Sequence, residues 1–114
     1  MRSTDFIQQY IFPGGCLPSV GQIMQSLGRK TDLKVIHLDD LAPHYARTLA
    51  SWRQNLHQHR EQIQSLGSHY GDQFLRLWDF YFSYCEGAFL ERSIGSVQML
   101  LTKPRCALPA PLPV

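Results

Sequence analysis

Three histidines in the middle of the chain are side chains that could do chemistry. His57 and His59 lie in the stretch HQHRE, and His69 follows ten residues after His59. Imidazole is a common metal ligand, but side chains two residues apart on a helix point about 200° apart and do not meet at one ion. We therefore predict a solvated helix face here and no metal site.

Tyr45, Tyr81 and Cys85 are the other chemically capable side chains. Tyr81 and Cys85 are four residues apart with Trp78 one turn earlier, which makes an apolar wall that carries one hydroxyl. Tyr45 begins an apolar stripe, where its ring can be buried while its hydroxyl seeks a partner. From spacing alone, core packing is the simpler interpretation. Cys85 has no histidine or other base at a local spacing, which argues against a thiolate nucleophile.

Several function classes lack their sequence signatures. No GxG or GxxxxGK loop follows a predicted strand, and there is neither an HExxH motif nor a serine nucleophile elbow. The three cysteines, Cys16, Cys85 and Cys106, include no CxxC pair, so we expect reduced thiols. The net charge is only +2 and the basic residues are scattered. We therefore predict no nucleic-acid partner, and at most a weak attraction to an anionic membrane surface.

Length and composition fit one globular domain at most. The 114 residues are 44% hydrophobic and 18% charged, which allows a modest core. The first residues, MRSTDFIQQ, contain an acid and no apolar run long enough for a signal peptide or a membrane span. We therefore expect no export or membrane anchor.

The first third of the sequence predicts two short helices and a strand. A helix through residues 6–11 would be capped by Ser3 or Thr4 and ended by Pro13. Ser19 predicts the start of a second helix, which Gly28 would close. The stretch LKVIHL, residues 33–38, predicts a strand.

The rest predicts two long helices and a closing strand. Pro43 suits the first position of a helix that runs to residue 66, where Gly67 ends it. A helix over residues 71–90 is apolar on two faces and must pack on both. Residues 97–102 predict a strand, and the proline-rich residues 105–114 predict a flexible tail. The expected stripe of the first long helix consists of Tyr45, Leu49, Trp52, Leu56, Ile63 and Leu66.

Taken alone, the chain is therefore predicted to be α+β and mostly helical, with about four helices and an antiparallel strand pair. An isolated strand pair is marginal in water, so the sequence looks like a part of a larger structure.

Four stretches, in this order and spacing, carry a resemblance to a known family: YIFPGGCLPS (10–19), HYARTLASW (44–52), RLWDFYFSYCEGAF (76–89) and VQMLLTKP (97–104). Together they resemble the C-terminal part of the cyclopropane fatty acid synthases, a family that includes mycolic acid-modifying relatives. Its members are S-adenosylmethionine-dependent methyltransferases that act on the double bond of an unsaturated phospholipid acyl chain. The resemblance implies an α/β fold of the Rossmann-like class I type, of which residues 1–104 form the acyl-binding cover and the last two strands.

The resemblance also implies roles for five residues. Tyr45 matches a tyrosine that helps position a bicarbonate ion, the proposed general base. Phe12, Leu17, Tyr81 and Cys85 resemble members of the apolar tunnel that holds the acyl chain in a dry site.

The family's cofactor loop and its catalytic cysteine, glutamate and histidine have no counterpart in this sequence. We therefore expect a truncated chain that binds no S-adenosylmethionine and is inactive alone, either a remnant or the complement of a separately encoded N-terminal part. Acting on phospholipid acyl chains, it would be cytoplasmic and peripheral to the inner membrane surface. Two alternatives remain open: a stand-alone lipid-binding module, and an interaction protein that offers a strand edge and a two-faced helix to a partner.

Overall fold

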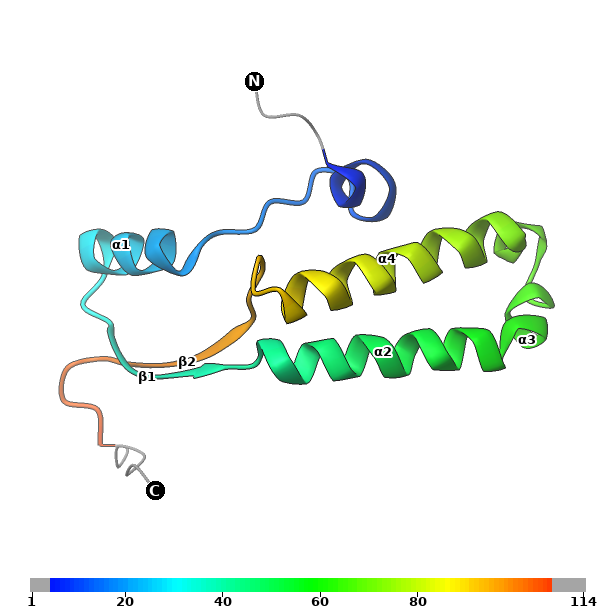
Figure 1. The fold of residues 1–114 in the computed structure, drawn as a ribbon. Coiled ribbons are helices and arrows are strands. Elements are labelled where there is room, and N and C mark those ends of the chain that lie inside the picture. The colour runs from blue at the N-terminus through cyan, green and yellow to red at the C-terminus, as the bar shows by residue number, and fades with distance from the viewer. Residues whose placement is uncertain (1–4, 108–114) are drawn as a thin grey trace. The chain divides into compact units, whose positions relative to one another are not determined.

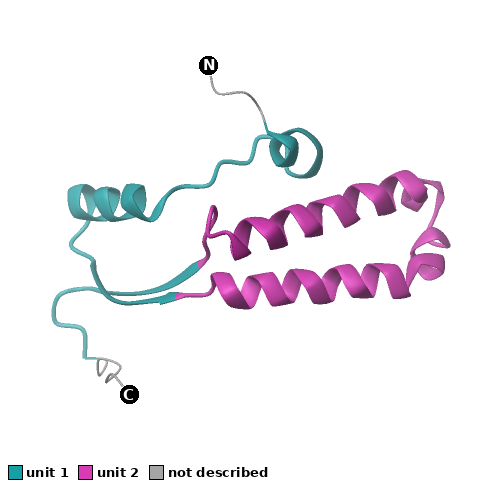
Figure 2. Cartoon of the chain, in the orientation of Figure 1, with its two compact units in different colours: residues 1–39, 97–114 teal, residues 40–96 magenta. Residues whose placement is uncertain are grey.

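Residues 5–107 are described by a computed structural model (Figure 1). As predicted, this part of the chain is mostly helical and contains a two-stranded antiparallel sheet. The chain divides into two units, residues 1–39 with 97–114 and residues 40–96 (Figure 2). The expected start of the first helix at Ser3 or Thr4 and most of the expected tail lie outside the described residues.

The first unit begins with the predicted short helix, which is a π-helix, η1 (Ile7–Ile11). The backbone N–H of Phe12 donates to the carbonyl of Ile7 at 2.8 Å, a bond that spans one residue more than in an α-helix. Asp5 caps this start, because its Oδ1 accepts from the backbone N–H of Gln8 at 2.8 Å. The helix ends before Pro13, as predicted.

Helix α1 (Val20–Lys30) follows after a loop. Ser19 caps it as predicted, and its side chain takes part in a complete capping box. The prediction that Gly28 closes the helix is wrong. Thr31 ends it instead, because its backbone N–H and its Oγ1 both donate to the carbonyl of Leu27, at 3.0 and 2.9 Å. A glycine costs only about 1 kcal/mol inside a helix, which such a terminal cap can offset.

The two strands pair with one another to form the sheet. Strand β2 (Val97–Thr102) has the predicted limits, whereas β1 (Lys34–Asp40) starts one residue later than predicted and ends two residues later. Side-chain acidity does not stop backbone pairing, so β1 continues through Asp39 and Asp40, whose side chains are exposed. None of the described residues of the first unit is buried, so the strand pair and α1 have no core of their own.

The second unit is a helical hairpin. Helices α2 (Ala42–Gln58) and α4 (Asp72–Leu90) lie side by side, and the short helices α3 (Arg60–Gln64) and η2 (Ser68–Tyr70) form the turn between them (Figure 1). All the buried hydrophobic residues of the described chain belong to this hairpin. They are Ala42, Ala46 and Leu49 on α2, and Leu75 and Cys85 on α4.

The prediction of one unbroken helix over residues 43–66 is wrong. The helix breaks at His59, whose ring Nδ1 lies 2.9 Å from the carbonyl oxygen of Asn55, the same oxygen that accepts from the backbone N–H of His59. A side chain that bonds to the carbonyl four residues earlier bends a helix.

The expected apolar stripe of this helix was only partly right. Leu49 is 3% exposed, but Trp52 is 47% and Leu66 is 70% exposed. Ala42 and Ala46 are buried in their place. Small side chains let two helices approach closely, so the innermost positions of α2 are occupied by alanines next to the stripe.

Candidate functional site

Tyr81 and Cys85 form a hydrogen-bonded pair on α4. The Tyr81 hydroxyl donates to the Cys85 sulfur, and Cys85 is only 5% exposed. Burial raises the pKa of Tyr81, and its contact with Cys85 adds to that rise. Burial also raises the pKa of Cys85, against the smaller opposite effect of the hydroxyl. Cys85 is therefore held as a neutral thiol, which suits an apolar wall and not a nucleophile.

Tyr45 lies on the first turns of α2 and meets α4 near Cys85. Its ring stacks on that of Phe89, with centroids 5.4 Å apart and planes inclined by 29°. The tyrosine is 38% exposed, so its ring is held while part of the side chain stays open. Phe89 follows Cys85 by one helical turn, and the hairpin therefore brings Tyr45, Tyr81 and Cys85 to one stretch of α4.

Phe12 and Leu17, the other two predicted acyl-tunnel residues, belong to the first unit. They are 54% and 90% exposed. The reversal expected between them is present: Gly14 has φ +77°, and the backbone N–H of Gly15 donates to the carbonyl of Phe12 at 3.0 Å. A positive φ is easily adopted only by glycine. The tunnel itself stays a prediction.

An aromatic row continues from this region along α4 toward the turn of the hairpin. Neighbouring rings have centroids 5.1–6.0 Å apart, within the range of favourable aromatic pairs. The sequence showed the α4 members as two separate apolar faces, whereas the structure joins them and adds one ring from α2 and one from η2. The row consists of Tyr70, Phe74, Trp78, Phe82 and Trp52.

An ionic cluster between the helices was missed by the sequence reasoning. Asp79 Oδ1 accepts from Arg53 Nε at 2.7 Å and lies 2.6 Å from His57 Nε2. The hydrogen bond from Arg53 holds the pKa of Asp79 below its usual range, and His57 adds to this effect against partial desolvation. Arg53 and His57 are one turn apart on α2, the one local signal that could have indicated a shared partner.

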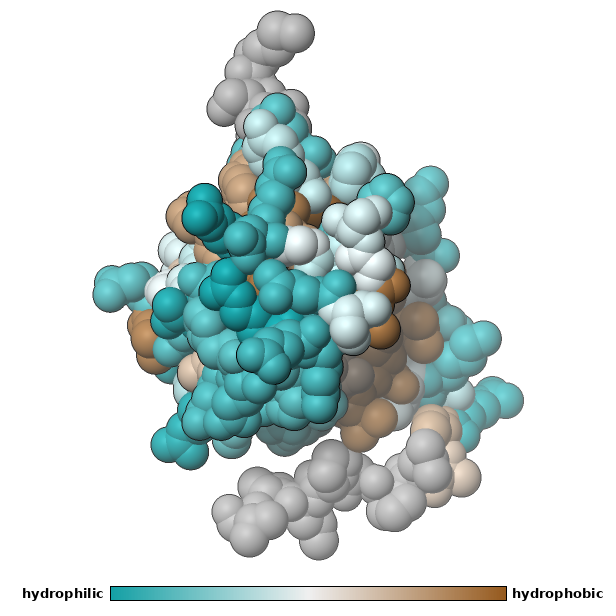
Figure 3. Space-filling view, turned by 90° about the vertical axis from the view of Figure 1, so that its right-hand side faces the viewer, coloured by the Kyte–Doolittle hydropathy of each residue, from teal (hydrophilic) through white to brown (hydrophobic). Residues whose placement is uncertain are grey.

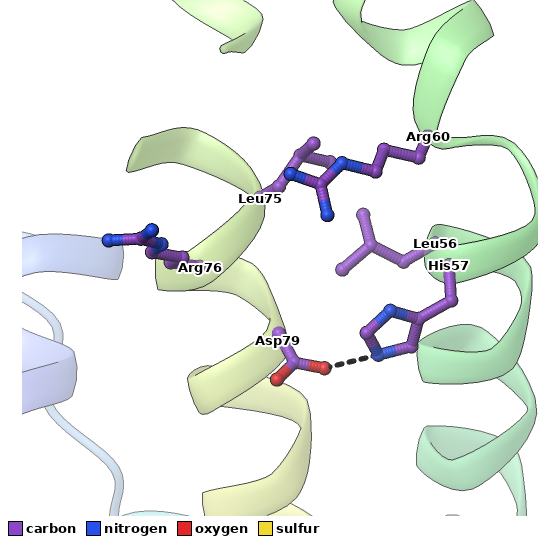
Figure 4. A pocket seen from close by; sticks show the side chains of 6 residues that line it. All are labelled: Leu56, His57, Arg60, Leu75, Arg76 and Asp79. Carbon is purple, nitrogen blue, oxygen red and sulfur yellow. Dashed lines mark hydrogen bonds and ion pairs between the residues drawn. The ribbon is translucent and has the colours of Figure 1, made fainter. Parts of the chain in front are cut away.

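A cavity of about 170 Å³ adjoins this cluster at the turn end of the hairpin (Figure 4). Figure 4 shows the Arg60 guanidinium reaching across from α3 toward Leu75, with Leu56 between it and the ring of His57. The lining residues are Leu56, His57, Arg60, Leu75, Arg76 and Asp79.

The open end of the hairpin is tied by polar contacts. Arg92 Nη1 donates to Asp40 Oδ2 at 2.9 Å, while Asp40 Oδ1 accepts from the backbone N–H of Ala42 at 3.0 Å. The backbone N–H of Leu41 also donates to the carbonyl of Ser96 at 2.8 Å. These contacts fix where the first turn of α2, and with it Tyr45, begins.

Comparison with known proteins assigns the chain to a family. The family model described as mycolic acid cyclopropane synthetase matches residues 1–99. The chain belongs to this family.

The curated relatives of this chain agree with its assignment to the cyclopropane synthetase family. Tuberculostearic acid methyltransferase UfaA1 of Mycobacterium tuberculosis is 42% identical over 98 residues, which is 86% of this chain and 22% of the relative. The cyclopropane-fatty-acyl-phospholipid synthase of Escherichia coli K12 is 33% identical over 98 residues, which is 86% of this chain and 24% of that enzyme. The match falls in the C-terminal part of the relatives, so the chain spans about a quarter of their length.

The cyclopropane synthetase family implies S-adenosylmethionine and, by the resemblance, bicarbonate, and residues 5–107 do not fit the S-adenosylmethionine. Strand β1 passes through Leu41 straight into α2, with no glycine-rich turn to approach a cofactor. For bicarbonate, these residues offer the partly exposed Tyr45, whose hydroxyl could donate one hydrogen bond to the ion while its ring stacks on Phe89. We assign no chemical step to either group in this chain.

Two further properties of residues 5–107 concern metal binding and membrane spanning. Within residues 5–107, no three histidine, cysteine, aspartate or glutamate side chains gather closely enough to hold a metal ion. No helix in the described range is long and apolar enough to cross a membrane.

Proposed function

We propose that this chain supplies the acyl-binding portion of an S-adenosylmethionine-dependent methyltransferase that modifies the double bond of an unsaturated phospholipid acyl chain. The family match over residues 1–99 carries the proposal. The names of the relatives support it, because they describe a methyltransferase and a cyclopropane synthase of fatty-acyl lipids. The cofactor site would lie outside residues 5–107, so the chain would not transfer methyl groups alone.

The hairpin offers the apolar surface that such a role needs. Tyr81, Cys85 and Phe89 follow one another along α4, and Tyr45 of α2 stacks on Phe89. Burial keeps the Cys85 thiol and the Tyr81 phenol neutral. A neutral apolar wall excludes water, which would otherwise trap a carbocation formed from the alkene.

Within this proposal the predicted roles are kept. Tyr45 would position the bicarbonate base, with Phe89 holding its ring, while Phe12 and Leu17 would complete the acyl tunnel together with Tyr81 and Cys85. The chain would work in the cytoplasm at the inner membrane surface. A separately encoded methyltransferase part would be its partner.

A chimaera tests the proposal. This chain would replace the matching segment of the Escherichia coli cyclopropane-fatty-acyl-phospholipid synthase, and the chimaera would receive labelled S-adenosylmethionine and unsaturated phospholipid vesicles. We expect labelled acyl chains with the chimaera and none with the chain alone. In the chimaera, Tyr45→Phe should lower the rate about 100-fold, the usual contribution of a positioned acid or base. A chimaera that binds S-adenosylmethionine but labels no lipid would contradict the proposal.

A second candidate is lipid binding without catalysis. It is favoured by the Leu41–Ser96 and Asp40–Arg92 contacts, through which the hairpin closes on itself. Trp52 and Trp78 both lie in the aromatic row and would report on a bound acyl chain by a blue shift of their fluorescence. This shift for the chain alone, with an inactive chimaera, would select the second candidate.

A further inference from the structure

We propose that the cavity at the turn end of the hairpin binds a phosphate group, either the phosphate of a phospholipid headgroup or free phosphate. This inference rests on the proposed function, because a portion that binds phospholipid acyl chains has a phosphate-bearing substrate. It concerns the turn end of the hairpin, away from Tyr45.

The cavity has donors that face its interior. Arg60 reaches across it (Figure 4). Its Nη2 donates to Asp72 Oδ1 at 2.6 Å. Among the described residues, Arg60 Nε and Nη1 make no hydrogen bond, so most of the guanidinium is available. A guanidinium matches the geometry of phosphate oxygens by donating two parallel hydrogen bonds.

The charges around the cavity leave it receptive to an anion. Arg53 balances Asp79, and Arg60 balances Asp72. Arg76 also lines the cavity and forms no ion pair with a described residue, but Figure 4 shows its guanidinium turned away from His57 and Arg60, so its positive charge acts on the cavity only from a distance. His57 shares Asp79 with Arg53 and would add a charge and a ring donor when protonated.

The cavity also has the right size and surroundings. Its volume of about 170 Å³ compares with about 30 Å³ for one water molecule in the liquid, so a group of several heavy atoms fits. Leu56 and Leu75 give one wall an apolar surface, while the Arg60 side chain, 55% exposed, stays open to a ligand from solvent. Figure 3 shows that the turn end of the hairpin is mainly hydrophilic on its outer face, as access for a charged ligand requires.

Nuclear magnetic resonance of the ¹⁵N-labelled full chain tests the site, with the Arg60 Nε signal as the readout. Inorganic phosphate and phosphatidylglycerol vesicles are titrated separately. We expect a saturable shift with inorganic phosphate. Vesicle binding that inorganic phosphate competes away would identify the headgroup as the source, and a response to inorganic phosphate alone would identify free phosphate. No response to either probe overturns the proposal.

Variants separate a specific site from general charge attraction. Arg60→Gln should weaken phosphate binding at least about tenfold, followed on the His57 ring signals, because it removes charge-assisted hydrogen bonds. Asp72→Asn should strengthen binding, because it removes a competing negative charge and frees Arg60. Arg47→Gln on α2, outside the cavity, is the matched control and should change little. Equal losses of phosphate affinity in Arg60→Gln and Arg47→Gln would overturn the proposal.

The two proposals fail independently. The chimaera assay follows methyl transfer to the acyl chain, whereas phosphate binding is measured on the chain itself. Loss of the phosphate response in a chain that still shows the acyl-induced tryptophan shift would remove the phosphate site and leave the acyl-binding function standing.

Discussion

Asp79→Asn is expected to loosen the helical hairpin, because Asp79 is the shared acceptor between α2 and α4. Its Oδ1 accepts from Arg53 Nε at 2.7 Å and lies 2.6 Å from His57 Nε2. Asparagine has nearly the same shape and keeps one acceptor oxygen but loses the charge. The variant therefore isolates the electrostatic part of the contact.

The magnitude follows from how far each group is exposed. The side chains of Asp79, Arg53 and His57 are 31%, 44% and 57% exposed. Exposed ion pairs contribute about 0.2–1 kcal/mol each, and this cluster holds two at short distance. We expect the free energy of unfolding to fall by about 0.4–2 kcal/mol, which corresponds to a midpoint lower by up to about 1 M urea.

The same contact predicts a pH dependence. The pKa of Asp79 is lowered in the folded chain, chiefly by the hydrogen bond from Arg53. Its stabilisation is therefore complete above the ordinary pKa of an aspartate and is lost as the pH falls through the lowered folded pKa. Asp79→Asn should lack this part of the acid-induced loss.

Urea unfolding followed by tryptophan fluorescence measures both effects, since Trp52 and Trp78 lie in the aromatic row. Glu61→Gln on α3 is the matched control, because it removes one exposed negative charge near the turn of the hairpin. Equal midpoints for the two variants, or an unchanged acid profile for Asp79→Asn, would refute the reasoning.

Three further predictions concern packing, capping and reactivity. Leu49→Ala should cost about 2–3 kcal/mol of unfolding free energy, since Leu49 is 3% exposed, whereas Leu66→Ala, at 70% exposure, should stay within about 0.5 kcal/mol in the same urea assay. Ser19→Ala should destabilise α1 by about 1 kcal/mol, seen as faster amide hydrogen exchange in that helix, while Ser26→Ala inside the same helix should not. Iodoacetamide should label the exposed Cys16 and Cys106 in the folded chain, and Cys85 only after unfolding. The reason is that burial both shields the Cys85 thiol and raises its pKa. Labelling of Cys85 at the same rate as Cys16 and Cys106 would contradict this prediction and show an open hairpin.

Local sequence signals determined most of the secondary structure. Strand β2 has the predicted limits, and Ser19 starts α1 as a capping residue should. These features depend on residues that are neighbours in the sequence. The family resemblance was also readable in advance, because it rests on four stretches in a fixed order, and the family match over residues 1–99 confirms it.

The features that the sequence pattern missed depend either on local partners that compete with one another or on partners that are distant in the sequence. Thr31 displaced Gly28 as the end of α1 through its two bonds to one carbonyl, and the ring of His59 broke a helix whose apolar pattern runs on unbroken. The choice of Ala42 and Ala46 over the larger stripe residues required the close approach of α4.

No local pattern could have identified Asp79 as the shared partner of Arg53 and His57. Arg53 and Asp79 are 26 residues apart, and only the hairpin turn brings them to 2.7 Å. The charged residues by themselves indicated a solvated helix face. The sequence thus determined which segments are helical and which family the chain belongs to, and the packing of α2 on α4 decided which of its polar side chains meet, because such contacts are set by distance in space and not along the chain.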